Sequence, residues 1–205
     1  TESGFPWQVL AADINGDGAL DPISAGDANW YDRTAIAKSV WDNGGVGSNC
    51  STVGNWRGDS IPTTSSHVSC SGTSSTVATW DSGCPSSIKG LILSDHNGAY
   101  ESTVTIDSAL HVGGDIRVQS GTLIVNAPLS ASGTVEIMSG AAIRVHAGGS
   151  LTVGDADDQL IVRGILTNSG TVNLGGQGEH ENHLSFFKQE IYGSVTNTAT
   201  STWNL

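Results

Sequence analysis

Basic residues are scarce in this sequence. Only 8 Lys and Arg stand against 20 Asp and Glu among 205 residues, so the formal net charge is −12. Nucleic acids and anionic membrane surfaces are bound by a basic protein face, and this charge balance argues against both as partners. An acidic chain instead favours solubility and the binding of divalent cations.

Long apolar runs are also missing. No stretch approaches the ~20 consecutive apolar residues that a membrane-spanning helix needs. Charged residues make up only 14% of the chain, fewer than a helical protein uses, whereas 27 residues are Gly. This composition is typical of short strands joined by tight turns and predicts an all-β protein.

Residues 101–175 alternate regularly between apolar and polar side chains. Most units have an apolar, a polar and an apolar residue, which places both apolar side chains on one face of a strand. Residues between them, such as His111, Arg117 and Glu136, should therefore face outward. The predicted core doublets are Val104/Ile106, Leu110/Val112, Ile116/Val118, Leu123/Val125, Val135/Ile137, Ile143/Val145, Leu151/Val153, Leu160/Val162 and Val172/Leu174.

Short turns rich in Gly and Ser precede these strands, as in Ser120-Gly121-Thr122 and Ser169-Gly170-Thr171. Because the chain turns after every three or four strand residues, we predict a single-stranded β-solenoid (β-helix). Each short strand would pair in parallel with its equivalent one coil, roughly 18–24 residues, away. The alternative is a β-sandwich or jelly roll built from the same strands.

The sequence divides into three predicted segments. Residues 1–45 form an N-terminal extension that contains an Asp-rich loop. Residues 46–100 contain the cysteines and form a cap with the first irregular coils. Residues 101–205 form the regular solenoid and a C-terminal tail.

The Asp-rich loop predicts a calcium site. Oxygen-bearing side chains stand at positions 1, 3, 5 and 9 of the loop, and Gly18 at position 6 permits a sharp turn, a spacing that wraps oxygen ligands around one Ca²⁺. A complete EF-hand requires Glu at position 12, where this chain has Ser24. The predicted ligands are Asp13, Asn15, Asp17, Asp21 and the backbone carbonyl of Ala19.

This loop resembles the calcium loops of FG-GAP repeats, and also those of dockerin and thrombospondin type 3 repeats. The apolar lead-in Val9-Leu10-Ala11-Ala12 is similar to the strand that precedes the loop in FG-GAP repeats. One copy is present, so the resemblance implies a structural calcium ion and no β-propeller.

Cys50, Cys70 and Cys84 lie close together in the sequence and predict one disulfide in an oxidising compartment. The pairing stays open, because spacing alone does not decide between the three possible pairs. Their spacing fits no zinc motif. Asn49-Cys50-Ser51 is a glycosylation sequon, which makes Asn49 a candidate glycan acceptor in a eukaryotic secreted protein.

A second resemblance begins at Val40-Trp41-Asp42-Asn43-Gly44-Gly45 and continues through Asn55-Trp56 to Pro62. Together with the repeats it is similar to the opening of β-helical adhesins and autotransporter passengers, and to the G8-type extracellular domain. The resemblance implies an extracellular or cell-surface β-helix. Physically, we expect Trp41 and Trp56 to cover the apolar end of the solenoid.

No catalytic constellation is evident. The carboxylates predicted to lie on the solenoid, Asp107, Asp115, Glu136 and Asp155, are scattered, whereas a glycosidase needs two held across a cleft. We therefore expect no enzyme. The first hypothesis is a calcium-stabilised extracellular structural or adhesive protein, with the self-assembling subunit of a surface filament or matrix as one form of it.

Self-association would use the solenoid ends or an N-terminal donor strand within residues 5–12. The alternative function is a carbohydrate-binding or polysaccharide-degrading β-helix, in which some of the six Trp would stack on sugars.

Overall fold

The computed structural model describes residues 10–12, 21–23, 38–71, 77–94, 99–154, 159–174, 188–198 and 200–204. The chain divides into two compact units, residues 1–37 and residues 38–205. Each unit is described separately below.

The first unit contains one antiparallel hairpin. Strand β1 (Leu10–Ala12) pairs with β2 (Asp21–Ile23). Ala12 lies opposite Asp21, so the hairpin brackets residues 13–20. The strand predicted to lead into the calcium loop is present, whereas the loop lies outside the described residues.

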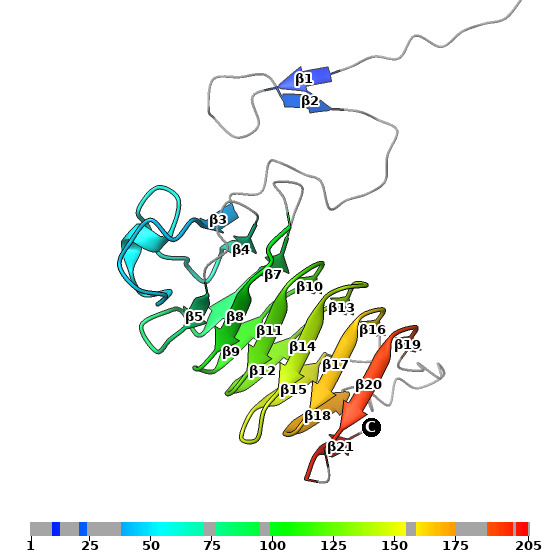
Figure 1. Ribbon diagram of the computed structural model, residues 1–205. Coiled ribbons are helices and arrows are strands. Elements are labelled where there is room, and N and C mark those ends of the chain that lie inside the picture. The colour runs from blue at the N-terminus through cyan, green and yellow to red at the C-terminus, as the bar shows by residue number, and fades with distance from the viewer. Residues whose placement is uncertain are drawn as a thin grey trace, which may run out of the picture. The chain divides into compact units, whose positions relative to one another are not determined.

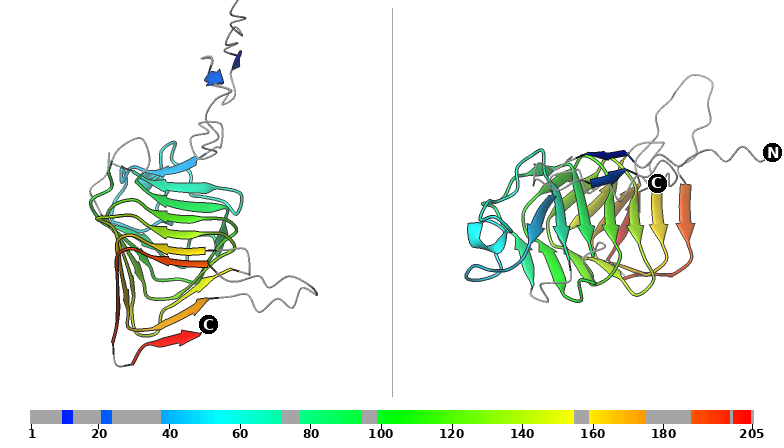
Figure 2. Two further views of the ribbon diagram at one scale, coloured as in Figure 1. Left: turned by 90° about the vertical axis from the view of Figure 1, so that its right-hand side faces the viewer. Right: turned by 90° about the horizontal axis from the view of Figure 1, so that it is seen from above.

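The second unit consists of three parallel sheets, which follow one another along the chain in every coil. In Figure 1 successive strands lie side by side from the cap near β3 to β19, β20 and β21 at the other end, and Figure 2 shows the same rows from two further sides.

The first sheet holds β3 (Lys38–Trp41), β4 (His67–Cys70), β7 (Gly90–Leu93), β10 (Ile116–Val118), β13 (Val135–Ile137), β16 (Gln159–Val162) and β19 (Lys188–Ile191). The second sheet holds β5 (Ala78–Trp80), β8 (Thr103–Ile106), β11 (Thr122–Val125), β14 (Ala142–Val145), β17 (Ile165–Asn168) and β20 (Ser194–Asn197). The third sheet holds β6 (Ser87–Ile88), β9 (Leu110–Val112), β12 (Pro128–Ala131), β15 (Ser150–Val153), β18 (Thr171–Leu174) and β21 (Thr202–Asn204).

These pairings confirm the predicted β-solenoid over the sandwich alternative. Val104 pairs with Leu123 and Leu123 with Ile143, at offsets of 19 (123 − 104) and 20 (143 − 123) residues. The sheets begin at β3, so strands β3 to β7 precede the regular zone recognised in the sequence. The helical structure among the described residues is a 3-10 turn, η1 (Val53–Asn55), and none of it is long and apolar enough to cross a membrane.

The core is a stack of apolar side chains between the three sheets. Every member of the nine predicted doublets is buried, with exposed fractions between 0% and 7%. Within residues 101–175 two further pairs join the stack, Leu129/Ala131 in β12 and Leu166/Asn168 in β17. The sequence pattern missed them because Ala131 is small and Asn168 is polar.

Glycines at the corners of the coils meet two different requirements. Gly121 has a φ of 74°, a conformation that side-chain-bearing residues rarely adopt. Gly149 has no such φ, but a Cβ there would collide with the carbonyl oxygen of Val125 in the neighbouring coil. Gly is therefore required at Gly121 by the sharp turn of the backbone, and at Gly149 by the close approach of the neighbouring coil.

The stacked core makes a testable prediction at β14. Ile143 is fully buried, whereas its neighbour Arg144 is exposed. Ile143→Ala should lower the free energy of unfolding by about 2–5 kcal/mol, because it removes buried apolar volume and leaves a cavity. Arg144→Ala should change it by less than about 0.5 kcal/mol. Urea denaturation followed by circular dichroism measures both, and similar losses in the two variants would contradict the assigned strand faces.

Candidate functional site at the ends of the solenoid

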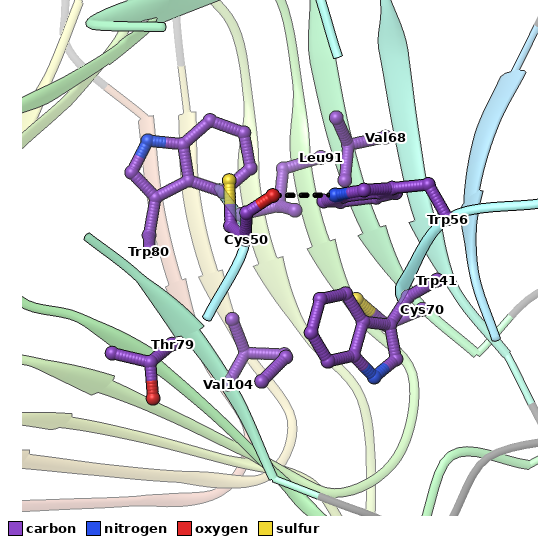
Figure 3. Close-up of a pocket in the computed structure, with 10 residues that line it drawn as sticks. Trp41, Cys50, Trp56, Val68, Cys70, Thr79, Trp80, Leu91 and Val104 are labelled. Atoms are coloured by element: carbon purple, nitrogen blue, oxygen red, sulfur yellow. Dashed lines mark hydrogen bonds between the residues drawn. The ribbon is translucent and has the colours of Figure 1, made fainter. Parts of the chain in front are cut away.

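Three tryptophans close the N-terminal end of the solenoid. Trp41, Trp56 and Trp80 are buried, and their rings meet edge to face, at centroid distances of 5.2 Å between Trp41 and Trp56 and 6.4 Å between Trp56 and Trp80. Figure 3 shows the three rings together with Cys50 and Cys70, and the Trp56 Nε1 that donates to the Cys50 carbonyl at 2.7 Å. The predicted capping role of Trp41 and Trp56 is confirmed, and Trp80 joins them.

Asn55 organises the loop of the cap. It is fully buried, and its side-chain amide donates to the carbonyls of Gly47 at 3.1 Å and Asn49 at 2.9 Å. Its side-chain oxygen accepts from the Gly45 N–H at 3.1 Å. A buried amide with its hydrogen bonds satisfied specifies one loop conformation, because any other would leave it unpaired at a cost.

The cap also occupies backbone groups at the first strand edges. Arg57 N–H donates to the carbonyl of Val40 in β3 at 2.9 Å. In β5, Thr79 N–H donates to the carbonyl of Ser48 at 2.7 Å, and its carbonyl accepts from Cys50 N–H at 2.8 Å. This end therefore offers few open backbone groups at β3 and β5 to another strand.

A disulfide joins Cys50 in the cap loop to Cys84 after β5, with a Cα–Cα distance of 6.0 Å. Cys70 lies outside the disulfide and is buried in β4 beneath the tryptophans. The sequence left the cysteine pairing open, and the folded cap decides it by bringing Cys50 and Cys84 together.

Tyr100 is also buried, and burial raises the pKa of its hydroxyl well above the usual value of 10.

Asp81 lies beside the disulfide and holds the cap loop against β5. Its carboxylate accepts from the Ser51 hydroxyl at 2.6 Å, from Ser51 N–H at 3.0 Å and from Gly83 N–H at 3.3 Å. Burial by itself would raise the pKa of Asp81, but these hydrogen bonds outweigh it and hold the pKa below 3.8. The side chain is therefore ionised at neutral pH.

Asp81, Cys50 and Cys84 place three potential metal-ligand atoms within 4.8 Å of one another. Metal ions bind the thiolate form of Cys, and here the two sulfurs are joined to each other. With the disulfide intact, this group is a structural tie between the cap loop and β5.

A small cavity lies between the cap and the first coils. It measures about 10 Å³ and is lined mainly by apolar groups, including Trp41, Trp56, Trp80 and Leu91. One water molecule needs a volume of this order together with polar partners. The cavity is therefore a gap in the packing and too small for a ligand.

The C-terminal end of the solenoid differs from the capped end. Strands β19, β20 and β21 are the last strands of their sheets, and no described residue pairs with their outer edges. The register places Ile191, Val195 and Trp203 in line with the buried Val162, Leu166 and Val172 of the preceding coil. Yet Ile191 is 47% exposed, and Val195 and Trp203 are half-buried.

Charged side chains on the sheets tie neighbouring coils together. Glu136 forms ion pairs with Arg163 and with Arg117, at 3.8 Å for the latter, and the guanidinium of Arg163 lies 5.7 Å from the ring centre of Tyr192. Asp107 accepts from the amide of Asn126 at 2.7 Å, and Asp115 accepts from Thr134 N–H at 3.0 Å. Each of these contacts joins one coil to the next.

The start of the first sheet is cationic. His67 is half-buried between Lys38 in β3 and Lys89 beside β7. Burial, and then the charges of Lys89 and Lys38, hold the pKa of His67 below 6.5. This imidazole is consequently neutral at pH 7.

Most of the predicted calcium ligands lie outside the described residues. Asp13, Asn15, Asp17 and Ala19 belong to the undescribed loop, and Asp21 is described only as backbone in β2. The calcium site stays a prediction, as does a glycan on Asn49, whose residue is exposed in the cap loop. Asp155 likewise lies outside the described residues.

Comparison of the chain with models of protein families, with curated proteins and with solved structures gave no match. The fold and the cap therefore define the class of the protein by themselves. It is an all-β, parallel β-solenoid closed at its N-terminal end by tryptophans and a disulfide.

The disulfide makes a prediction for the stability of the cap. Its two cysteines are 34 residues apart, and in the chain-entropy model a loop of this length stabilises the folded state by about 3–4 kcal/mol. A reductant should lower the melting temperature of the wild-type protein, measured by circular dichroism.

The double variant Cys50→Ser/Cys84→Ser is the matched control. It should melt at the lower temperature both with and without reductant, because it has no disulfide to lose. If the reductant leaves the melting temperature of the wild-type protein unchanged, the disulfide does not contribute to its stability.

Proposed function

We propose that this chain is an extracellular structural and adhesive module that self-associates through the ends of its solenoid. The observation that carries the proposal is the position of its exposed apolar side chains. Five of the six large exposed apolar side chains among the described residues lie at the two ends: Val46, Val53 and Val77 at the capped end, and Ile191 and Tyr192 in the last coil. The sixth, Ile165, lies in β17, one coil before that end. Gathered exposed apolar groups are typical of contact surfaces on soluble proteins.

The outward side of the third sheet is built differently. On the third sheet, His111 Nδ1 lies 3.0 Å from the Ser130 hydroxyl, and Asn173 donates to Thr152 at 3.1 Å. Asn204 donates to Asn173 in turn. These side chains satisfy one another from coil to coil, so the face supports the stack and gives little reason for another protein to bind there.

Two further features support an extracellular setting. The disulfide is a bond that persists in oxidising compartments and is rare in the cytosol. The Asp-rich loop predicts a calcium ion, which extracellular modules commonly use for structural order. The proposed module is therefore calcium-stabilised as well as disulfide-bonded.

The carbohydrate alternative loses support from the positions of the tryptophans. Trp41, Trp56 and Trp80 are part of the buried cap, so three of the six Trp cannot stack on a sugar. The one small cavity that borders them admits no sugar ring. We therefore place self-association ahead of sugar binding.

Size-exclusion chromatography with light scattering tests the proposal. The protein should form species larger than the 21.0 kDa monomer as its concentration rises, and negative-stain microscopy should show solenoids joined at their ends. Contacts along the sheet faces, or a monomer at every concentration, would contradict it. A glycan array provides the alternative outcome, because saturable binding to one polysaccharide by a monomer would favour a carbohydrate-binding module.

Calcium removal is a separate prediction. A chelator should lower the melting temperature of calcium-loaded protein, because an ion that binds only the folded state stabilises that state. Asp17→Ala should behave like chelation and should show no further change when chelator is added. Glu101→Ala is a control that should keep the response to chelator, since Glu101 is an exposed acidic residue outside the loop. If the melting temperature is the same with and without calcium, the proposal that calcium stabilises the module is wrong.

A further inference from the structure

We infer that the C-terminal coil pairs with the same coil of a second copy, in a closed two-fold contact in which edge strands run antiparallel. This inference rests on the proposed function and adds to it the surface and the symmetry of one contact. It commits to a second copy of this chain as the occupant of the open end.

Backbone geometry makes the open coil able to extend its sheets. At β20, the N–H groups of Ser194 and of Thr198, which directly follows the strand, donate to the preceding coil, at 2.9 Å to the Gly164 carbonyl and 2.9 Å to the Asn168 carbonyl. Because successive N–H groups alternate in direction along a strand, the N–H groups of Val195 and Asn197 point to the open side. The exposed edge therefore carries donors and acceptors in the spacing that another strand needs.

The other two edges repeat this pattern. Tyr192 N–H donates to Val162 in the preceding coil at 2.7 Å, and Thr202 N–H donates to Gly170 at 2.9 Å. Alternation then directs the N–H groups of Ile191 and Trp203 to the open side. All three sheets consequently end in an edge of the same kind.

Apolar side chains accompany these open edges. Ile191, Val195 and Trp203 occupy the interior positions of the last coil, where their equivalents one coil earlier are buried. A second solenoid end placed against this one would continue the core over them. The gain is the burial of apolar surface together with new backbone hydrogen bonds.

The charge distribution favours a second copy as the occupant. The whole chain has a net charge of −12, whereas the last coil has no net charge: residues 191–205 contain no Asp, Glu, Lys, Arg or His, and Lys188 and Glu190 of β19 are of opposite sign. Two copies of a strongly acidic protein would repel each other over most surfaces, and a contact through this coil keeps that repulsion low.

The capped end explains why the contact is two-fold. A head-to-tail contact would have to extend β3 and β5, whose edge groups at Val40 and Thr79 already bond to the cap. The open end of one copy finds a matching set of free edges at the open end of another. Such a contact is isologous, and the strands that meet across its axis run in opposite directions.

Two isoleucines of similar exposure test the contact. Ile191, at 47% exposure, lies in the open coil and points to its interior, whereas Ile165, at 50%, lies in β17 one coil away from the open edge. Ile191→Lys should raise the dimer dissociation constant at least ~10-fold, because a charge would be buried without a partner. Ile165→Lys should leave it close to that of the wild type. Sedimentation equilibrium measures both constants, and equal effects of the two variants would overturn the inference.

Cysteine crosslinking tests the symmetry even if Ile191→Lys frays the last coil. Tyr192→Cys, Thr196→Cys and Asn204→Cys each place one exposed thiol at the outer edge of a different sheet. A two-fold contact in which one edge strand pairs with its own copy brings that strand's thiol beside its equivalent, so the variant on that strand should form a disulfide-linked homodimer under mild oxidation. Crosslinking by none of the three, in protein that still associates, would overturn the two-fold contact.

The outcomes separate this inference from the proposed function. Long assemblies with all molecules in the same polarity would support end-to-end association and exclude the closed contact. A protein that stays monomeric at every concentration would contradict both the proposed self-association and the two-fold contact. Dimers that dissociate in Ile191→Lys, and persist in Ile165→Lys, would support both.

Discussion

Parallel pairing between one coil and the next is the interaction on which this structure depends. Each short strand has too few residues to be stable alone, and its backbone groups are satisfied only by the equivalent strand one coil away. The same pairing aligns the apolar doublets into one continuous core, in which nearly every interior side chain is buried. Glycines such as Gly149 keep the coils close enough for both effects.

The first and last coils of such a stack each have one side on which no further coil covers the core or pairs with the strand edges. The two ends of this solenoid differ in how these groups are covered. The N-terminal end is closed by side chains and backbone from the cap loop, held in place by Asn55 and by the Cys50–Cys84 disulfide. At the C-terminal coil no described strand pairs with the outer edges of β19, β20 and β21, and the interior residue Ile191 is half exposed. The ends are therefore the better candidates for a contact surface, since the outward side chains of the third sheet hydrogen-bond one another from coil to coil.

Local sequence predicted the regular part of the fold well, and the reason is periodicity. Alternation at Leu123 and Val125 or at Leu151 and Val153 reports directly which side chains face inward. The pattern failed at β17, where the buried Asn168 looks like a surface residue in the sequence. Its side chain donates to the Thr202 carbonyl at 3.2 Å and accepts from Gly170 N–H at 3.1 Å, partners that only folding brings to it.

By itself the sequence determined the all-β class, the solenoid, the core doublets and the covering role of Trp41 and Trp56, because composition and alternation act over a few neighbouring residues. Only the tertiary structure decided which cysteines pair, that Trp80 completes the cap, and that the core is closed at one end while no described strand pairs with the last strands at the other. These features depend on contacts between residues far apart in the chain, such as Cys50 with Cys84 or Trp56 with Trp80. No local pattern contains that information, because it is the number and registration of the coils that bring such residues together.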